Sequence, residues 1–239
     1  MSGLLQKIHE YFQYDLGNFS AAFAALPFAA LAALIYWLIR RSRHKKKLNE
    51  SFKTARKQAR WNEIIRLLLV FWIAEIACVT LFPIWFWGDV ISMFFGAWHW
   101  NLRGEYSLSI RWQYIPTLWF MIADPQYFTG DSTLRYVLEW AANVVLFVPL
   151  GLALPFVMKR PKFWKVTLIG FGCTFFIELV QPFVFREGTA DDVINNTLGA
   201  VIGYLLYLAM KKLFPKFTQK CKVTVWDKTD NTTRKETIT

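Results

Sequence analysis

Residues 175–203, FFIELVQPFVFREGTADDVINNTLGAVIG, decide the fold, because they place acidic and amide side chains between two apolar runs. Each run is long enough to belong to a membrane span, where an unpaired polar group is costly. Such side chains must satisfy one another or contact a ligand. The polar residues of this stretch are Glu178, Gln181, Arg186, Asp191, Asp192, Asn195 and Asn196. The stretch therefore predicts two membrane helices joined by a polar turn.

The composition is that of a membrane protein. Of the 239 residues, 55% are hydrophobic, 18% are aromatic and only 19% are charged, which is too apolar for an ordinary soluble domain. A membrane-spanning helix needs about 20 mostly apolar residues to cross about 30 Å of hydrocarbon. We therefore expect an all-α, polytopic integral membrane helical bundle with about five transmembrane helices. The expected spans are residues 20–39, 64–87, 134–157, 166–185 and 192–213.

The basic residues predict the orientation of these spans. The formal net charge is +11, and the lysines and arginines cluster in short segments beside the apolar runs. Cytoplasmic loops and anionic lipid headgroups explain this pattern better than nucleic acid does. The alternation of the basic loops predicts an outside N-terminus and an inside C-terminus. The expected parts are an N-terminal segment with the first span and a basic cytoplasmic loop (1–65), a membrane domain (66–213) and a basic cytoplasmic tail (214–239).

Residues 88–133 form the expected outer segment between the second and third spans. Trp98, Trp100, Trp112 and Trp119 are interleaved along it. Such aromatic content is typical of the membrane interface. The segment is therefore either a set of short interfacial helices that covers a membrane-facing site, or an aromatic-anchored loop with no role in ligand binding.

The histidines and cysteines give no sign of a metal or cofactor site, and we expect neither group. His9, His44 and His99 are scattered over both predicted sides, and no phosphate-binding or dinucleotide glycine pattern is present. The three cysteines are expected to be unpaired. Glu75 lies near the middle of the second span, where a carboxyl group must be protonated or paired.

The polar turn begins with a predicted helix break. Pro182 cannot donate a hydrogen bond to the carbonyl group of Glu178, four residues earlier. Such a break is tolerated at membrane depth only where protein or water satisfies the freed carbonyl group. Thr189, with Asp192 three residues later, resembles a capping box for the next helix. Together these features favour a hydrated cavity near the outer leaflet.

The fifth expected span carries polar residues and glycines on one stripe, namely Asp192, Asn196, Gly199 and Gly203. The two glycines form a small-xxx-small packing face that allows a close helix contact. Because the preceding turn is short, the fourth span should run antiparallel to the fifth. We therefore expect residues 166–185 to pack against this stripe.

Two interpretations of the polar residues compete. In the structural one, Asn143 of the third span and its partners form a hydrogen-bonded network that fixes the helix packing. In the functional one, Glu178 or Asp192 is a catalytic residue that transfers a proton, and Arg186 binds an anionic headgroup. The expected ligand-binding residues are Asn143, Gln181, Arg186 and Asn196. Intramembrane ionisable residues favour the functional interpretation for the set as a whole.

Several short motifs, in a fixed order, resemble the VanZ-like family. They are LFP at 81–83, IP at 115–116, NVVLFVPLG at 143–151, ELVQ at 178–181, Arg186, and DDVINNTLGAVIG at 191–203. The resemblance covers about residues 80–208. The first span, its basic loop and the C-terminal tail are expected to lie outside it.

The resemblance implies a small polytopic protein of the bacterial cell membrane. The founding member of the family confers low-level resistance to teicoplanin, a lipoglycopeptide, without remodelling the peptidoglycan precursor. The residues that match the polar positions of the family are Asn143, Glu178, Gln181, Arg186, Asp192 and Asn196. The expected partners are membrane lipids and a lipid-linked glycan or lipoglycopeptide, which the chain binds or modifies. The alternative is a non-catalytic membrane organiser, and both the reaction and the oligomeric state stay open.

Overall fold

The computed structural model describes residues 16–45, 53–82, 86–87, 112–117, 119, 131–184 and 186–222. Most of the N-terminal lead, most of the expected outer segment and the last residues of the tail lie outside the described residues. The predictions for those parts, including the interfacial helices of residues 88–133, stay predictions.

Six helices occur within the described part of the chain. They are α2 (Leu16–Lys45), α3 (Lys53–Leu81), α6 (Asp131–Val157), α7 (Phe163–Val180), α8 (Ala190–Leu213) and α9 (Pro215–Cys221). The first five are long and apolar enough to cross a membrane, as the sequence predicts. The candidate spans are Ala22–Arg41, Trp61–Leu81, Tyr136–Val157, Phe163–Val184 and Ala190–Leu213. The chain is thus a multi-pass, almost entirely helical membrane protein, and its orientation stays a prediction.

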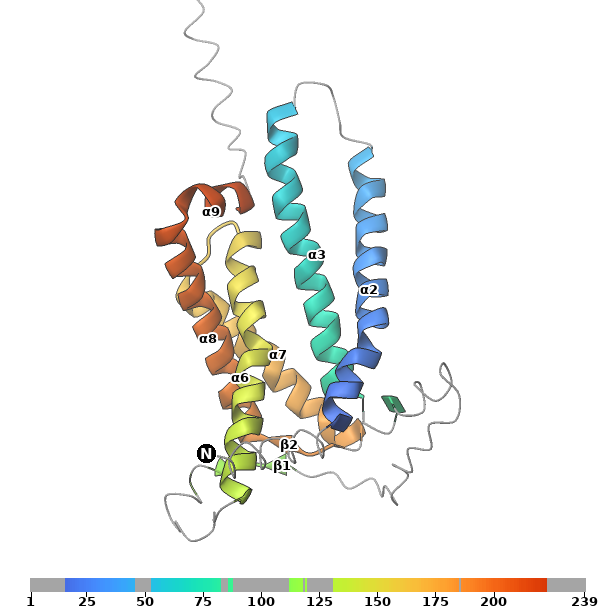
Figure 1. Ribbon diagram of the computed structural model, residues 1–239, viewed down its shortest axis with the longest axis vertical. Helices are drawn as coiled ribbons and strands as arrows, with labels where there is room; N and C mark the ends of the chain where they lie inside the picture. The colour runs from blue at the N-terminus through green and yellow to red at the C-terminus, as the bar shows by residue number, and fades with distance from the viewer. Residues whose placement is uncertain are drawn as a thin grey trace, which may run out of the picture.

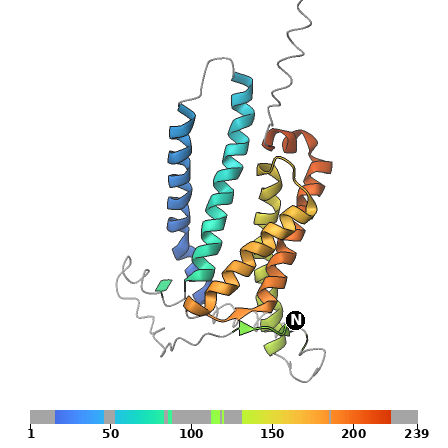
Figure 2. The same cartoon turned by 180° about the vertical axis from the view of Figure 1, so that it is seen from behind.

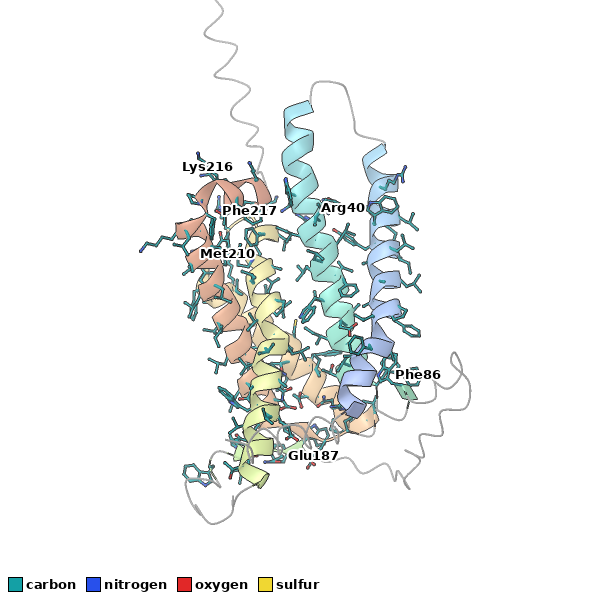
Figure 3. All side chains as sticks on the ribbon, viewed as in Figure 1. Arg40, Phe86, Glu187, Met210, Lys216 and Phe217 are labelled. Atoms are coloured by element: carbon teal, nitrogen blue, oxygen red, sulfur yellow. The ribbon has the colours of Figure 1, made fainter. Side chains whose placement is uncertain are left out.

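The helices are arranged in two groups that share α3. Helices α2 and α3 lie side by side, and α3 also contacts the group formed by α6, α7 and α8 (Figures 1 and 2). We call the end of the bundle where α3 and α7 end and α6 and α8 begin the site end. The opposite end, where α8 ends and α9 lies, is the basic end. Glu187 marks the site end and Lys216 the basic end in Figure 3.

A two-stranded parallel pairing joins distant parts of the chain at the site end. Strand β1 (Trp112–Gln113) pairs with β2 (Gly188–Thr189), so that Trp112 lies opposite Gly188. Strand β1 belongs to the tryptophan-rich segment, and β2 is part of the turn between α7 and α8. The pairing therefore brings part of that segment to the turn.

The second expected span is shorter than predicted. Helix α3 ends at Leu81, whereas the prediction extended the span to Trp87. Trp87 is 2% exposed, and its ring lies 5.6 Å from the ring of Phe28 on α2, measured between centroids. Beyond the end of α3, the apolar run therefore supplies a tryptophan that packs against α2.

The glycines of the α8 stripe pack against α6, so the prediction that α7 covers the stripe is wrong for Gly199 and Gly203, although α7 does bond to Asp192 and Asn196 of the same stripe. A Cβ atom on Gly199 would lie 2.1 Å from the carbonyl oxygen of Val144, and Gly203 faces α6 in the same way. From the other side, a Cβ atom on Gly151 of α6 would lie 2.0 Å from the carbonyl oxygen of Ala200. The two backbones touch because all three residues lack a side chain.

Helix α7 contacts the neighbouring face of α8. A Cβ atom on Gly170 of α7 would lie 2.5 Å from the Cβ atom of Ala200, one residue after Gly199. One residue rotates the direction of a side chain by about 100° around a helix axis. The short turn fixes α7 as an antiparallel neighbour of α8, but it does not fix which face of α8 is in contact.

At the basic end, an asparagine of α3 forms hydrogen bonds to two other helices. Asn62 is 8% exposed, and its amide Nδ2 donates to the carbonyl oxygens of Phe156 and Cys221, at 3.0 Å each. Arg66 Nε donates to Asn62 Oδ1 at 2.7 Å. These bonds connect α3 to the ends of α6 and α9. The three cysteines are free, which confirms that they are unpaired.

The helix contact predicts a different response to alanine at two glycines. Gly151→Ala should force α6 and α8 apart and cost about 1–3 kcal/mol, as overpacking does. The apparent melting temperature of the detergent-purified protein should fall by about 2–4 °C for each kcal/mol. Gly172→Ala is the matched control, because nothing lies within 4 Å of a Cβ atom there. Equal melting temperatures for the two variants would contradict the close contact.

Candidate functional site

The predicted helix break lies at the end of α7. Helix α7 ends at Val180 and continues as one 3-10 turn, η1 (Gln181–Val184), which contains Pro182. The backbone N–H of Arg186 then donates to the carbonyl oxygen of Gln181 at 3.1 Å. The chain reverses direction within these few residues.

Gly188 allows the turn to pass against the end of α7. A Cβ atom at this position would lie 2.5 Å from the carbonyl oxygen of Glu178 and 2.7 Å from a ring atom of Trp112. Only glycine fits without displacing backbone atoms. The sequence offered no signal for this role, because Trp112 is far away along the chain.

Glu178 holds the turn by a buried hydrogen bond. The residue is 5% exposed, and its Oε2 accepts the backbone N–H of Thr189 at 2.9 Å. Thr189 is the N-cap of α8, and its Oγ1 accepts the backbone N–H of Asp192 at 3.1 Å. The threonine half of the predicted capping box is therefore confirmed. Through Thr189, the carboxylate of Glu178 positions the start of α8.

The start of α8 is also bonded to α6 and α7. Asn143 Nδ2 of α6 donates to Asp192 Oδ1 at 2.5 Å. Thr174 Oγ1 of α7 donates to the carbonyl oxygen of Asp192 at 3.4 Å and accepts from Asn196 Nδ2 at 2.9 Å. Thr174 is fully buried, and nothing in the sequence marks its role, because a lone threonine in an apolar run has no distinguishing pattern.

Two residues of the turn bond to the end of α3. Arg186 Nη1 donates to the carbonyl oxygen of Val79 at 3.1 Å, and Gln181 Nε2 donates to that of Thr80 at 3.3 Å. The last four carbonyl groups of a helix have no partner within the helix. A cation and an amide donor are therefore suited to this helix end, which carries partial negative charge.

The cluster contains two acidic side chains and one basic side chain. The carboxylates of Glu178 and Asp192 lie near one guanidinium group, that of Arg186. Burial lowers the pKa of the Arg186 guanidinium, and the two carboxylates oppose that shift. None of the contacts among the described residues is a direct ion pair between Arg186 and either acid. The two carboxyl groups and the guanidinium group therefore interact over a distance and not through a direct ion pair.

Several buried oxygens lack a hydrogen-bond partner among the described residues. Gln181 Oε1 and Asn196 Oδ1 belong to residues that are 3% and 2% exposed. Each is an acceptor that a water molecule or a donor group of a ligand can satisfy. Glu75 Oε2 of α3 also lacks such a partner, and the residue is 5% exposed. The prediction that Glu75 is protonated or paired stays open.

A pocket of about 380 Å³ opens at the site end beside this cluster. Its wall combines the starts of α6 and α8 with part of the tryptophan-rich segment. The lining residues are Tyr114, Ile115, Pro116, Trp119, Tyr136, Trp140, Asp191, Ile194 and Asn195. Asp191 and Asn195 precede Asp192 and Asn196 directly, so α8 presents one polar pair to the pocket and the other to the bundle.

Asp191 attaches the tryptophan-rich segment to α8. Its Oδ2 accepts the backbone N–H of Thr117 at 2.8 Å and the hydroxyl group of Thr117 at 2.5 Å. The hydroxyl group of Tyr136 donates to Oδ1 at 3.4 Å. The described residues of this segment therefore form one wall of the pocket. The aromatic lining could not be located from the sequence, because it comes from segments far apart in the chain.

All of the predicted site residues lie at the site end. The structure brings together Asn143, Glu178, Gln181, Arg186, Asp192 and Asn196 and adds Thr174 and Thr189 as connecting residues. The carboxylates accept hydrogen bonds from within the bundle, and their catalytic role stays a prediction. No group of three or more histidine, cysteine, aspartate or glutamate side chains able to hold a metal occurs among the described residues.

The network predicts an unequal response to the loss of two hydroxyl groups on α7. Thr174→Val removes the bond to Asp192 and leaves the amide of Asn196 unpaired, at a cost of about 1 kcal/mol. Thr167→Val is the matched control, because the hydroxyl group of Thr167 bonds only within its own helix, to the carbonyl of Phe163. Thermal unfolding in detergent should show a lower melting temperature for Thr174→Val alone. Similar values for the two variants would mean that the network does not stabilise the bundle.

The sequence also matches a known family. The family model described as VanZ/LLP1 matches residues 28–211. No curated protein and no solved structure matches in the corresponding comparisons. The matched region is wider than the expected residues 80–208. It begins within the first span and includes the basic loop, so the expectation that these two parts lie outside it is wrong, whereas residues 214–239 of the tail do lie outside it. The match covers most of the chain, and the protein belongs to the VanZ/LLP1 family.

Proposed function

We propose that the chain binds an amphiphilic molecule of the bacterial cell envelope at its site end and thereby lowers sensitivity to lipoglycopeptides such as teicoplanin. The observation that supports this function is the pocket of about 380 Å³ beside the buried polar cluster. Ligand sites typically have about 300–1,000 Å³. The link to resistance comes from the resemblance to the family's founding member.

The position of the pocket fits an amphiphile. Tyr136 and Ala190 are the first residues of two candidate spans, so the pocket lies where those spans meet the interface. Trp140 and Ile194 line the pocket and are 38% and 52% exposed. A headgroup in the pocket would leave an acyl chain free to follow the apolar faces of α6 and α8. In the predicted orientation this end faces outside, where lipoglycopeptides act.

The geometry supports binding better than covalent modification. A general acid or base must reach the group with which it exchanges a proton. Glu178 Oε2 and Asp192 Oδ1 are instead engaged with Thr189 and Asn143 inside the bundle. A modification reaction would need a substrate to reach the second oxygen of one of these carboxyl groups inside the bundle.

One observation favours a second candidate function, that of a non-catalytic membrane organiser. Each predicted site residue makes a hydrogen bond to another helix or to the turn backbone. In this reading the polar cluster only fixes the packing of α3, α6, α7 and α8. The two candidates differ in whether the pocket matters for resistance.

Filling the pocket tests the binding function directly. Ile194→Trp places a larger side chain in the lining, and we expect the teicoplanin sensitivity of cells that express this variant to equal that of cells with no copy. Leu198→Trp is the matched control, since Leu198 lies one turn further along α8, is 37% exposed and does not line the pocket. Immunoblots of membranes verify equal abundance. Full protection by Ile194→Trp would contradict the proposal.

Conservative changes in the cluster separate binding from organisation. Glu178→Gln keeps an oxygen acceptor for Thr189 N–H but removes the charge, and Arg186→Lys keeps the charge but removes the planar fork. We expect near-normal abundance of both variants together with loss of resistance. The measurement pairs membrane abundance with the inhibitory concentration of teicoplanin. A parallel fall of abundance and resistance would instead support the organiser.

A further inference from the structure

We propose that the pocket recognises the ammonium group of its amphiphile, through aromatic rings and the carboxylate of Asp191. This inference rests on the proposed function and deepens it, because it names the chemical group that the pocket binds. It concerns the pocket lining and not the buried cluster beneath it.

Four of the nine lining residues are aromatic. Tyr114 and Trp119 come from the tryptophan-rich segment, and Tyr136 and Trp140 come from the first turns of α6. A cation within about 6 Å of an aromatic ring is attracted to its face. Rings that approach one space from separate segments are typical of sites that bind methylated ammonium groups.

Asp191 supplies a negative charge that no cation among the described lining residues balances. These residues include one carboxylate and no lysine, arginine or histidine. Among the described residues, the partners of the Asp191 carboxylate are Thr117 and Tyr136, which offer an amide and two hydroxyl groups. Arg186 donates instead to the carbonyl oxygen of Val79. The missing positive charge is therefore one that a ligand can bring.

The same partners hold the carboxylate in place before a ligand binds. Thr117 bonds to Oδ2 through both its backbone and its side chain, and Tyr136 approaches Oδ1 from α6. A preorganised charge loses little freedom when a ligand binds. A sulfate or phosphate group, by contrast, would be repelled by Asp191, and the lining residues that the structure describes include no cation to compensate. The pocket therefore selects cationic groups, and a zwitterionic headgroup would enter with its ammonium group first.

Binding of alkyl probes with different headgroups tests this inference. The full chain in dodecyl maltoside is titrated with decyltrimethylammonium, decylamine and decyl sulfate, and binding is followed by tryptophan fluorescence. The alkyl chain is the same in all three probes, so only the headgroup varies. We expect saturable binding of the two cations and at least about tenfold weaker binding of the sulfate.

Two variants and a control assign the binding to the pocket. Asp191→Asn and Trp140→Leu should each weaken binding of decyltrimethylammonium by about tenfold. Trp164→Leu should not, because Trp164 is an exposed tryptophan at the start of α7 outside the pocket. Trp140→Leu leaves the bonds of Asp191 intact, so it remains informative if Asp191→Asn fails to fold. Equal binding of cation and sulfate, or equal binding by Trp140→Leu and the unchanged chain, would overturn the inference.

Free amines and lipids distinguish what the ligand requires. Competition by choline or ethanolamine would show that the ammonium group alone is sufficient. Retention of phosphatidylcholine over phosphatidylglycerol from mixed nanodiscs, with no competition by free amines, would show that a lipid chain is also required. Either outcome supports ammonium recognition. If the cationic probes bind but Ile194→Trp still protects cells, the proposed function is wrong and the ammonium inference stands. If Ile194→Trp abolishes protection but cationic and anionic probes bind equally, the ammonium inference is wrong and the proposed function stands.

Discussion

The hydrogen bond from Thr189 N–H to the Glu178 carboxylate is the constraint on which the site end depends. It ties the turn to the end of α7 across 11 residues of chain. Thr189 in turn caps α8 and so fixes where that helix begins. Because a buried carboxylate without a donor is costly in a membrane, the bond also satisfies Glu178. The same turn supplies β2, which holds the segment that contains Trp112.

Two faces of α8 carry polar side chains from residues that are adjacent in the sequence. Asp192 and Asn196 face the bundle and bond to α6 and α7, whereas Asp191 and Asn195 line the pocket. Helix α8 must keep a fixed rotation about its own axis, because a small rotation would move both carboxylates. The close contact of the α8 glycines with α6 provides that restraint, since touching backbones leave no space for rotation.

Features that depend on local sequence were predictable, and those that depend on distant contacts were not. The five spans follow from apolar run length, and the turn follows from Pro182 and Thr189. The polar residues gather at one end of the bundle because successive spans cross the membrane in opposite directions. The partner of the glycine stripe depends on helix rotation, which a short loop does not set. The role of Gly188 and the pocket depend on the pairing with Trp112, a contact between segments far apart in the chain.

The fold explains how an aspartate can line a pocket that has no cation among its described lining residues. Asp191 and Asp192 both lie in the first turn of α8. Unpaired N–H groups give a helix N-terminus partial positive charge, which stabilises a nearby carboxylate by about 0.3–1 kcal/mol. Arg186 lies close to Asp192 and Glu178, and the hydroxyl groups of Thr117 and Tyr136 serve Asp191. The helix end and these donors therefore keep a negative charge at the pocket, although no cation occurs among its described lining residues.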